Sequence, residues 1–387
     1  MNRNIKIARI ATVPFFLDHQ LKHQISDLID DGFDVTAISS EIGDWSGLRA
    51  IHDLECVILN ISRQPAPLED LVSLFRLYRL FKKHNFDIIH STTPKAGLLC
   101  AIAGWLARVP VRLHTFTGQT WATKTGFSKK LLRLLDKVIV MLNTRCYADS
   151  ESQRSYLNSH GVGDTESIKV LGDGALAGVD LERFNSNKWS VHKHEAMAEL
   201  ALTADDFVIT FIGRLSKEKG IYELLEAMEI LDKRYDKLKL ILVGPCEESI
   251  TAEHLKEWAD RPYIRHVGET NLPEKYLALS NLLCLPSYRE GFGTVVIEAA
   301  AMRLPTVGTN ITGLVDAVED GETGVLVEPA NVQQLVLGLE QLISNPKACT
   351  EMGQRAYQRC QRLYDSKIIS RLIAAEYIEL IQRSANE

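Results

Sequence analysis

The sequence contains no pair of cysteines in a CxxC arrangement. Its cysteines are instead scattered along the chain, and several lie in apolar stretches: Cys56, Cys100, Cys146, Cys246, Cys284, Cys349 and Cys360. An odd and scattered set argues against a disulfide framework and against a cysteine-based zinc site. We therefore expect reduced thiols and a cytoplasmic location.

Long apolar runs are absent as well. The longest uncharged apolar run in the N-terminal half covers residues 96–107, whereas a helix that spans a bilayer needs about 20 such residues. The first residues do not contain the apolar core of a signal peptide. We expect any contact with a membrane to be peripheral.

Positive charge is not in excess over the whole chain, which carries a net charge of −6. This balance does not favour nucleic acid as a partner. Within the chain, however, residues 71–146 hold 13 Lys and Arg but only 2 Asp and Glu. This basic segment is a candidate for contact with an anionic membrane or with phosphate groups.

Apolar runs typical of strands alternate with helical patterns along the 387 residues, a length that suits two domains. This alternation predicts parallel pairing, and we expect an α/β fold with two doubly wound, Rossmann-like domains. The first covers residues 1–187, with a polar break at 185–187, and the second covers 188–365. A C-terminal helix at about 366–387 is expected to pack back on the first domain.

The residue patterns also predict the individual elements. The expected strands are 5–13, 33–39, 54–60, 87–90, 110–116, 146–149, 168–171, 207–212, 238–243, 264–267, 282–286, 306–308 and 324–327. The expected helices are 17–29, 68–84, 94–107, 128–142, 191–200, 220–234, 295–302, 332–343 and 368–382.

The most informative stretch covers residues 282–302, LLCLPSYREGFGTVVIEAAAM. We expect an apolar strand, then a turn with two glycines, and then a helix that Thr294 caps. This order of elements points free backbone N–H groups at an anion. Two carboxylates that could bind sugar hydroxyls, Glu290 and Glu298, flank the turn. The stretch therefore indicates a nucleotide-sugar site, with two solvated surface glutamates as the alternative.

Glu290 and Glu298, separated by seven residues, resemble the EX7E motif of retaining glycosyltransferases of the GT-B fold, family 4. The surrounding sequence, EGFGTVVIEAAAMRLPTVGT, is similar to that family too. The resemblance is good over about 205–330 and moderate over about 85–185. It implies a GT-B architecture, with ligands beyond the carboxyl ends of the strands in a cleft between the domains.

The resemblance also assigns roles around the turn. It implies that Glu298 holds the ribose hydroxyls of the donor and that Glu290 holds a hydroxyl of the transferred sugar. Backbone N–H groups of Phe292, Gly293 and Thr294 are expected to bind the sugar or the diphosphate. The other expected donor-binding residues are Gly291, Gly213 and Val267. An ordinary strand end is the alternative for Val267.

A second motif, GRLSKEKG at residues 213–220, directly follows an expected strand. In family 4 the Arg and Lys that correspond to Arg214 and Lys219 neutralise the donor diphosphate and stabilise the leaving group. The diphosphate gains negative charge as its bond breaks, so cations held in place there lower the barrier. We expect both residues to be catalytic, with a solvated basic turn as the alternative.

In the first half, HTFTG at residues 114–118 resembles a family segment in which a second histidine acts at the reaction centre. Thr117 stands at the position of that histidine, so the sequence departs from the family pattern. Thr117 and His114 are our candidate catalytic residues here, and Gly118 is expected to contact the acceptor. For His114, a buried ring that is merely hydrogen-bonded is the alternative.

The segment HSTTPKAG at residues 90–97 resembles the His-x-His-x-Pro-Lys-Ala-Gly of bacterial polysaccharide enzymes in the family. His90 and Lys95 match that pattern, whereas Thr92 replaces the second histidine. Lys95 stands at a helix start, where the helix dipole repels a cation. A nearby anion such as a diphosphate of the acceptor would explain its place. We expect His90 and Lys95 to bind the acceptor, with a surface lysine as the alternative.

Together these features predict a cytoplasmic retaining glycosyltransferase, peripheral at the inner face of the cell membrane. It is expected to move a hexosyl or N-acetylhexosaminyl group from a UDP-sugar to a hydroxyl of a lipid-linked or saccharide acceptor. The expected pathway is biosynthesis of a surface polysaccharide, lipopolysaccharide or capsule. The sequence shows no metal-ligand cluster, and family 4 works without a bound metal, so we expect neither a metal nor a cofactor.

Two other functions stay open at this point. One is a GT-B nucleotide-sugar epimerase. The other is a non-catalytic protein that binds nucleotide sugars, which the threonine at position 117 would suit.

Overall fold

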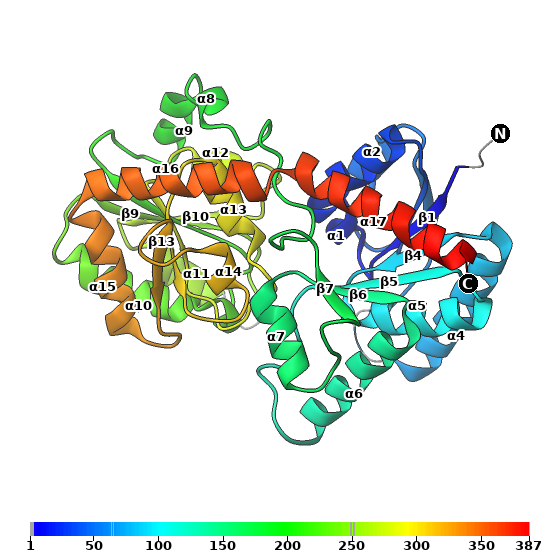
Figure 1. Ribbon diagram of the computed structural model, residues 1–387. Coiled ribbons are helices and arrows are strands. Elements are labelled where there is room, and N and C mark those ends of the chain that lie inside the picture. Colours follow the sequence, from blue (N-terminus) through cyan, green and yellow to red (C-terminus); the bar gives the residue numbers. More distant parts are fainter. Residues whose placement is uncertain (1–3, 63, 65, 248–249, 251, 387) are drawn as a thin grey trace. The chain divides into compact units, whose positions relative to one another are not determined.

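The structure is a computed structural model that describes residues 4–62, 64, 66–247, 250 and 252–386. The chain divides into two compact units (Figure 1). Unit 1 comprises Met1–Gly178 and Ser366–Glu387, and unit 2 comprises Val179–Asp365. The polar break expected at 185–187 lies inside unit 2. The Asn185 side chain accepts a hydrogen bond from the Asn187 amide there and begins helix α8 (Ser186–Trp189).

The described residues of unit 1 form a parallel sheet of seven strands, in the order β3-β2-β1-β4-β5-β6-β7. Its strands are β1 (Lys6–Ile10), β2 (Asp34–Ser39), β3 (Glu55–Ile58), β4 (Ile88–Ser91), β5 (Val111–Phe116), β6 (Arg145–Ala148) and β7 (Ile168–Val170). Its helices are α1 (Pro14–Gln20), α2 (Lys22–Asp30), α3 (Ser46–Arg49), α4 (Pro67–His84), α5 (Pro94–Ala107), α6 (Gly126–Leu142), α7 (Glu151–Ser159) and α17 (Ser366–Asn386).

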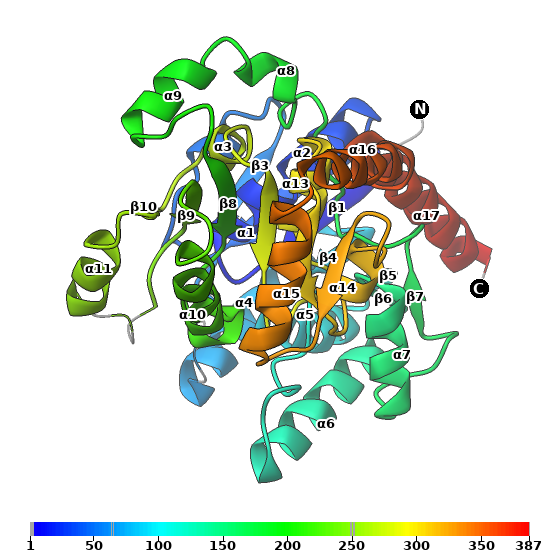
Figure 2. The same cartoon turned by 90° about the vertical axis from the view of Figure 1, so that its left-hand side faces the viewer.

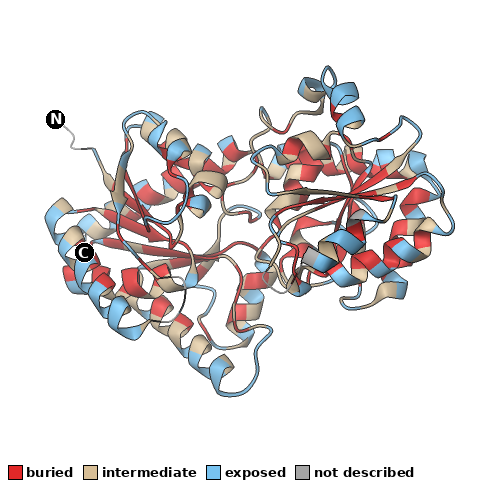
Figure 3. Ribbon diagram, turned by 180° about the vertical axis from the view of Figure 1, so that it is seen from behind, coloured by how far each residue is buried: buried red, intermediate tan, exposed pale blue. Residues whose placement is uncertain are grey.

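Residues that alternate along β1 pack on opposite faces of this sheet. Ile7 belongs to a core that also contains residues of α2 and α17. Ala8 and Ile10 belong to the core formed with α4 and α5. In Figure 3 the strands of each unit are buried along most of their length, while the outer faces of the helices are exposed.

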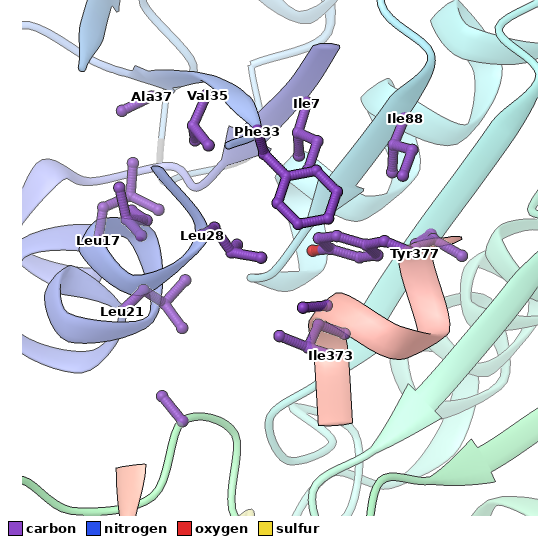
Figure 4. Close-up of a cluster of buried hydrophobic side chains, with 14 of the residues drawn as sticks. Ile7, Leu17, Leu21, Leu28, Phe33, Val35, Ala37, Ile88, Ile373 and Tyr377 are labelled. Atoms are coloured by element: carbon purple, nitrogen blue, oxygen red, sulfur yellow. The ribbon is translucent and has the colours of Figure 1, made fainter. Parts of the chain in front are cut away.

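Helix α17 covers one face of the unit 1 sheet. Its Ile373 and Tyr377 lie among Ile7, Leu28 and Phe33 (Figure 4). The Phe33 and Tyr377 rings meet edge to face, with centroids 6.2 Å apart. The last helix of the chain therefore completes a core that the first strands begin.

A row of polar side chains lies under α17 within this apolar face. Arg9 Nη1 donates a hydrogen bond to the Tyr377 hydroxyl at 2.6 Å. That hydroxyl donates to His90 Nδ1 at 2.6 Å, and His90 Nε2 donates to Thr115 Oγ1 at 2.8 Å. Burial holds the pKa of His90 well below its usual range, so the imidazole is neutral and fits this chain of donors.

Unit 2 is built on a second parallel sheet of six strands among the described residues, ordered β10-β9-β8-β11-β12-β13. Its strands are β8 (Phe207–Ile212), β9 (Leu238–Val243), β10 (Ile264–Gly268), β11 (Leu282–Leu285), β12 (Thr306–Thr309) and β13 (Gly324–Val327). Its other helices are α9 (Lys193–Glu199), the 3-10 helix η1 (Lys217–Lys219), α10 (Ile221–Asp232), α11 (Ala252–Ala259), α12 (Pro273–Leu277), α13 (Thr294–Ala301), α14 (Leu314–Ala317), α15 (Val332–Ile343) and α16 (Pro346–Leu363). Figure 2 shows α10 and α15 packed side by side.

Several helices were not among those expected from the sequence, and α7 and α16 are two of them. Helix α7 begins where Ser150 Oγ accepts from the Gln153 amide. The buried positions of α16 include Gly353 and Ala356, and a Cβ at Gly353 would lie 2.1 Å from the Arg303 carbonyl oxygen. Small residues that allow such close contact give a weak apolar pattern, which explains why the sequence does not reveal this helix.

Two further expectations concern the state of the cysteines and the absence of a membrane-spanning helix. All seven cysteines are free thiols, as expected. None of the helices in the described residues combines the length and the apolar composition that a membrane span requires.

We expect Tyr377→Phe to destabilise the protein by about 1–3 kcal/mol, because it leaves Arg9 and His90 buried with a lost partner. Urea unfolding measures the loss. Tyr222→Phe is the matched control, since Tyr222 is exposed on α10. Equal unfolding midpoints for the two variants would contradict the role given to the Tyr377 hydroxyl.

Candidate active site

The turn after β11 is held against its neighbours by glycines. Gly293 has a φ of +86° and is the N-cap of α13, so Thr294 is the first helical residue and the expectation that it caps the helix is wrong. A Cβ at Gly313, beside the turn, would lie 2.5 Å from the Gly291 carbonyl oxygen. Phe292 is buried, and its ring meets Tyr364 with centroids 5.2 Å apart. The turn is therefore a rigid support for the backbone N–H groups at the start of α13.

The loop after β8 crosses close to this turn. Gly220 has a φ of +70°, and a Cβ there would lie 2.0 Å from the Pro286 carbonyl oxygen. The Tyr288 amide donates to the Glu218 carbonyl at 2.9 Å, and Arg289 Nη2 donates to the Glu218 carboxylate at 3.1 Å. Because β8 and β11 are neighbours in the sheet, their loops leave from the same edge and meet.

This crossing brings together two residues that the sequence selects separately. Lys219 Nζ donates to Glu290 Oε1 in a short ion pair. Ser287 Oγ donates to the same carboxylate oxygen at 2.7 Å. Both side chains are largely shielded from solvent. The carboxylate and the ammonium that the motifs single out thus form one polar centre.

Arg214 lies at the other end of the same loop. Its guanidinium is 3.6 Å from the Glu247 carboxylate, and its side chain is 41% exposed. It follows Gly213, whose amide donates to the Val243 carbonyl at 2.9 Å. Arg214 is thus a cation on the loop after β8, and the hydrogen bond of Gly213 ties this loop to the end of β9.

Glu298 lies one turn into α13 and is half-buried. Loss of solvent around its carboxyl raises the pKa of Glu298 to about 7; the charge of Arg183 opposes this rise and that of Glu274 adds to it. Arg183 itself is held by Glu274 through Nε at 3.1 Å and Nη2 at 3.0 Å. Val267 lies near the end of β10, half-buried, and the neighbouring Gly268 carbonyl accepts from the Gly244 amide.

In unit 1 the structure gives Lys95 partners within the protein. Its ammonium is 2.5 Å from the Asp70 carboxylate and donates to the Gln64 carbonyl oxygen at 2.5 Å. The anion that balances Lys95 at the start of α5 is therefore a side chain in the first turn of α4, which packs on α5. An acceptor diphosphate is not required to explain this lysine.

The structure also corrects the expectations for the two candidate histidines, His90 and His114. His90 is buried with both ring nitrogens engaged in the row under α17, so it does not present a group to an acceptor. His114 is buried against Ser91 Oγ, 3.0 Å from its Nδ1. Burial lowers the pKa of His114 to about 3, so the ring is neutral. A Cβ at Gly97 would lie 2.4 Å from this ring, so the ring packs directly against the backbone of α5.

Thr117 and Gly118 are placed differently from His114. They follow β5, at the carboxyl edge of the unit 1 sheet, and Thr117 is half-buried. Gly118 has a φ of +103°, a backbone conformation that favours glycine. These two residues remain available as candidates on the acceptor side.

The described residues contain no group of three or more His, Cys, Asp or Glu side chains arranged to hold a metal ion.

The comparisons with known proteins agree over both halves of the chain. The model of the glycosyl transferases group 1 matches residues 192–359, and that of the glycosyl transferase 4-like domain matches residues 19–174. The capsular polysaccharide biosynthesis glycosyltransferase CapM of Staphylococcus aureus is 30% identical over 386 residues, 99% of each chain. The chain belongs to the group 1 glycosyltransferases.

Further relatives support this assignment. The UDP-Gal:alpha-D-GlcNAc-diphosphoundecaprenol alpha-1,3-galactosyltransferase of Escherichia coli is 26% identical to this glycosyltransferase over 343 residues, 87% of each chain. Among solved structures, HepE of Anabaena superposes with a TM-score of 0.81 at 21% identity, covering 97% of this chain and 100% of HepE. The expected GT-B fold is confirmed.

Sequence reasoning missed two residues beside Glu298 in this glycosyltransferase, Arg183 and Glu274. They are far apart in the chain, and no motif links them. Only the fold shows that they form a partly buried ion pair whose charges act on the carboxyl of Glu298.

A small cavity in unit 1 was also not expected. It measures ≈ 20 Å³ and is lined by residues that include Gln24, His90 and Asp149. Asp149 Oδ1 and Gln24 Oε1 are buried and have no hydrogen-bond partner among the described residues. Burial raises the pKa of Asp149 to about 8, so this carboxyl is protonated at neutral pH. The space and the polar lining suit one water molecule.

We expect Asp149→Asn to stabilise the glycosyltransferase above pH 5. The folded-state pKa of about 8 exceeds the unfolded value of about 4. The folded protein therefore keeps a proton that the unfolded chain loses, and wild-type stability falls as pH rises between these two values. Because asparagine does not titrate, the variant does not lose stability in this pH range.

Urea unfolding from pH 4 to pH 9 measures the effect. The advantage of the variant should grow by up to about 1.4 kcal/mol per pH unit and level off above pH 8. Asp173→Asn, an exposed position of the following loop, is the control. Parallel pH profiles for wild type and Asp149→Asn would show that the carboxyl is not held protonated.

Proposed function

We propose that this chain is a retaining, family 4 glycosyltransferase that moves a sugar from a UDP-sugar to a hydroxyl of a lipid-linked acceptor. The observation that carries the proposal is the Lys219–Glu290 ion pair where the loops after β8 and β11 meet. It joins a carboxylate suited to a sugar hydroxyl and a cation suited to a diphosphate at the start of α13.

The donor is proposed to bind on unit 2. Glu298 accepts hydrogen bonds from the ribose, and N–H groups of Phe292, Gly293 and Thr294 meet the sugar or the diphosphate. Gly213, Gly291 and Val267 complete the backbone around the donor. Support for UDP comes from HepE, whose crystal structure contains UDP and glucose. The Escherichia coli relative also uses a UDP-sugar by its name.

The bond that breaks joins the anomeric carbon to a diphosphate oxygen. The acceptor oxygen bonds to that carbon on the same face of the sugar, and the acceptor proton passes to the departing diphosphate. Arg214 and Lys219 stabilise the negative charge that grows on the diphosphate. Because the leaving group takes the proton, Thr117 can stand where a histidine is usual and donate a neutral hydrogen bond. No step in this scheme calls for a metal or a cofactor.

The acceptor is proposed to belong to a surface polysaccharide pathway. Support comes from the names of relatives, which include capsular polysaccharide biosynthesis and diphosphoundecaprenol-linked sugars. Thr117 and Gly118 are the proposed acceptor-side residues. A lipid-linked acceptor lies in a membrane, so a cytoplasmic enzyme that contacts an anionic membrane surface is part of the proposal.

The test is a panel of nucleotide sugars, each incubated with and without a short-chain diphosphate-linked sugar acceptor. We expect transfer from one UDP-sugar, with the α configuration kept in the product by nuclear magnetic resonance. An inverted product contradicts retention. An altered sugar nucleotide without acceptor would indicate an epimerase, and tight binding without turnover would indicate a binding protein.

We expect Lys219→Ala to lower kcat about 100-fold or more, because it removes a charge that acts as the bond breaks. Lys217→Ala is the matched control, since Lys217 is exposed in the same 3-10 helix. Steady-state kinetics, with circular dichroism to confirm folding, compare the two. A normal kcat for Lys219→Ala would show that this loop is only a solvated basic turn without a catalytic role.

We expect Glu298→Ala to weaken UDP-glucose binding by about 1–3 kcal/mol, through lost hydrogen bonds to ribose. With a pKa of about 7, the wild-type carboxyl must lose a proton to accept both bonds fully, so affinity should fall several-fold from pH 8 to pH 6. Glu298→Gln, which cannot titrate, should give a flat profile. Calorimetry measures both, and unchanged affinity in Glu298→Ala rejects the ribose assignment.

A further inference from the structure

Three neighbouring helices of unit 1 expose apolar side chains to solvent. Helix α4 packs on α5 and α5 packs on α6 (Figure 1). We call their exposed apolar side chains the outer face. It consists of Leu68, Leu71, Val72 and Phe75 of α4, Trp105 and Leu106 of α5, and Phe127, Leu131, Leu134 and Met141 of α6. Exposed apolar groups gathered on neighbouring elements indicate an interaction surface.

Helix α6 presents the clearest part of this face. Phe127, Leu131, Leu134 and Met141 are spaced by four, three and seven residues, so they lie along one side of the helix. They are 79%, 43%, 55% and 73% exposed. The buried positions of the helix, among them Ile139, lie on its other side. The helix is thus apolar toward the core and apolar toward solvent.

Helix α4 repeats this arrangement and adds charge. Leu68, Leu71 and Phe75 lie on its exposed side, while Leu77 and Phe81 are buried. One and two turns beyond Phe75, Arg79 and Lys82 continue the same exposed side. The Arg79 guanidinium lies over the Phe75 ring, 5.8 Å from its centroid. Apolar and basic groups therefore share one surface.

The exposed charges near the outer face are positive except for Glu69. Basic residues on the three helices and their ends are Arg76, Arg79, Lys82, Lys83, Arg108, Lys129, Lys130, Arg133 and Lys137. Of the acidic residues in these helices, Asp70 pairs with Lys95 and Asp136 is buried, where it accepts from Trp121 Nε1 at 2.7 Å. Glu69 is the exposed acid that remains. A partner that suits this surface is apolar inside and anionic at its boundary.

We propose that the outer face docks on an anionic lipid bilayer, with its apolar side chains among the lipid chains and its basic side chains at the phosphates. This inference rests on the proposed function, which places the acceptor in a membrane. It also changes the expectation from the sequence, which was docking by charge alone. Charge attraction is screened by salt, whereas apolar insertion is not. Docking should therefore be only partly reversed by salt.

The test is flotation of the full-length protein with vesicles of phosphatidylcholine alone or mixed with phosphatidylglycerol, at low and high salt. The vesicles contain neither donor nor acceptor. We expect binding to the anionic vesicles, reduced but not abolished at high salt. Trp105 fluorescence should shift to the blue on binding, and Trp105→Phe should remove that shift. Loss of all binding at high salt would reject apolar insertion.

Matched variants distinguish binding through the outer face from nonspecific adsorption by exposed apolar residues. Leu131→Gln with Leu134→Gln should weaken partitioning about tenfold or more, because two apolar side chains no longer leave water. Val191→Gln with Leu337→Gln changes two exposed apolar residues of unit 2 and should leave it unchanged. Arg79→Glu with Lys130→Glu should abolish the preference for anionic vesicles. Wild-type partitioning by the α6 variant would overturn the proposal.

Two further outcomes bear on the proposal. If the wild type ignores anionic vesicles but sediments as a dimer that the α6 variant breaks, the outer face is a contact between copies and membrane docking is wrong. Transfer to a water-soluble acceptor is measured in parallel. Vesicle binding without transfer would reject the proposed function and keep the docking surface, and transfer without vesicle binding would do the reverse.

Discussion

In a parallel sheet every strand ends at the same edge, and this constraint organises both units. In unit 2, β8 and β11 are neighbours although they are distant in sequence, so the loops that follow them leave from the same edge and meet. Glycines at the crossing let the two backbones touch, and Lys219 and Glu290 meet as a result. In unit 1 the same constraint places Thr117 and Asp149, which follow β5 and β6, at one edge of the sheet.

The sequence predicts the parts of this arrangement that depend on local patterns. Strands buried on both faces are continuous apolar runs, and β8, β9 and β13 lie where they are expected. The two loop motifs of unit 2 contain their own glycines, so their geometry is encoded locally. The sequence does not reveal which group forms an ion pair with a given charged side chain. Lys95 was expected to meet a ligand, but its anion is Asp70, brought close only when α4 packs on α5.

Residue type also fails to predict which face of an element is buried. Arg9 and His90 are polar but lie in the interior, because Tyr377 and Thr115 complete their hydrogen bonds. Phe127 and Leu134 are apolar but exposed, because the opposite side of α6 already supplies the core. The apolar side chains of α6 form one wide face, and the sequence does not tell which part of that face is buried and which is exposed. The basic charge of this region was visible in the sequence, whereas its apolar surface became visible only in the fold.

The position of α17 in the sequence, after all of unit 2, affects when unit 1 can finish folding during synthesis. A ribosome releases the N-terminal residues first, yet the core around Ile7 and Phe33 is not covered until Ile373 and Tyr377, which follow all of unit 2, have emerged. Unit 2, which is continuous from Val179 to Asp365, has all its strands available earlier. Unit 1 therefore begins before unit 2 and is completed after it, and the nascent chain carries an open apolar face while unit 2 is made. A chimera that exchanges unit 1 between related enzymes would therefore need α17 as well as the residues up to Gly178.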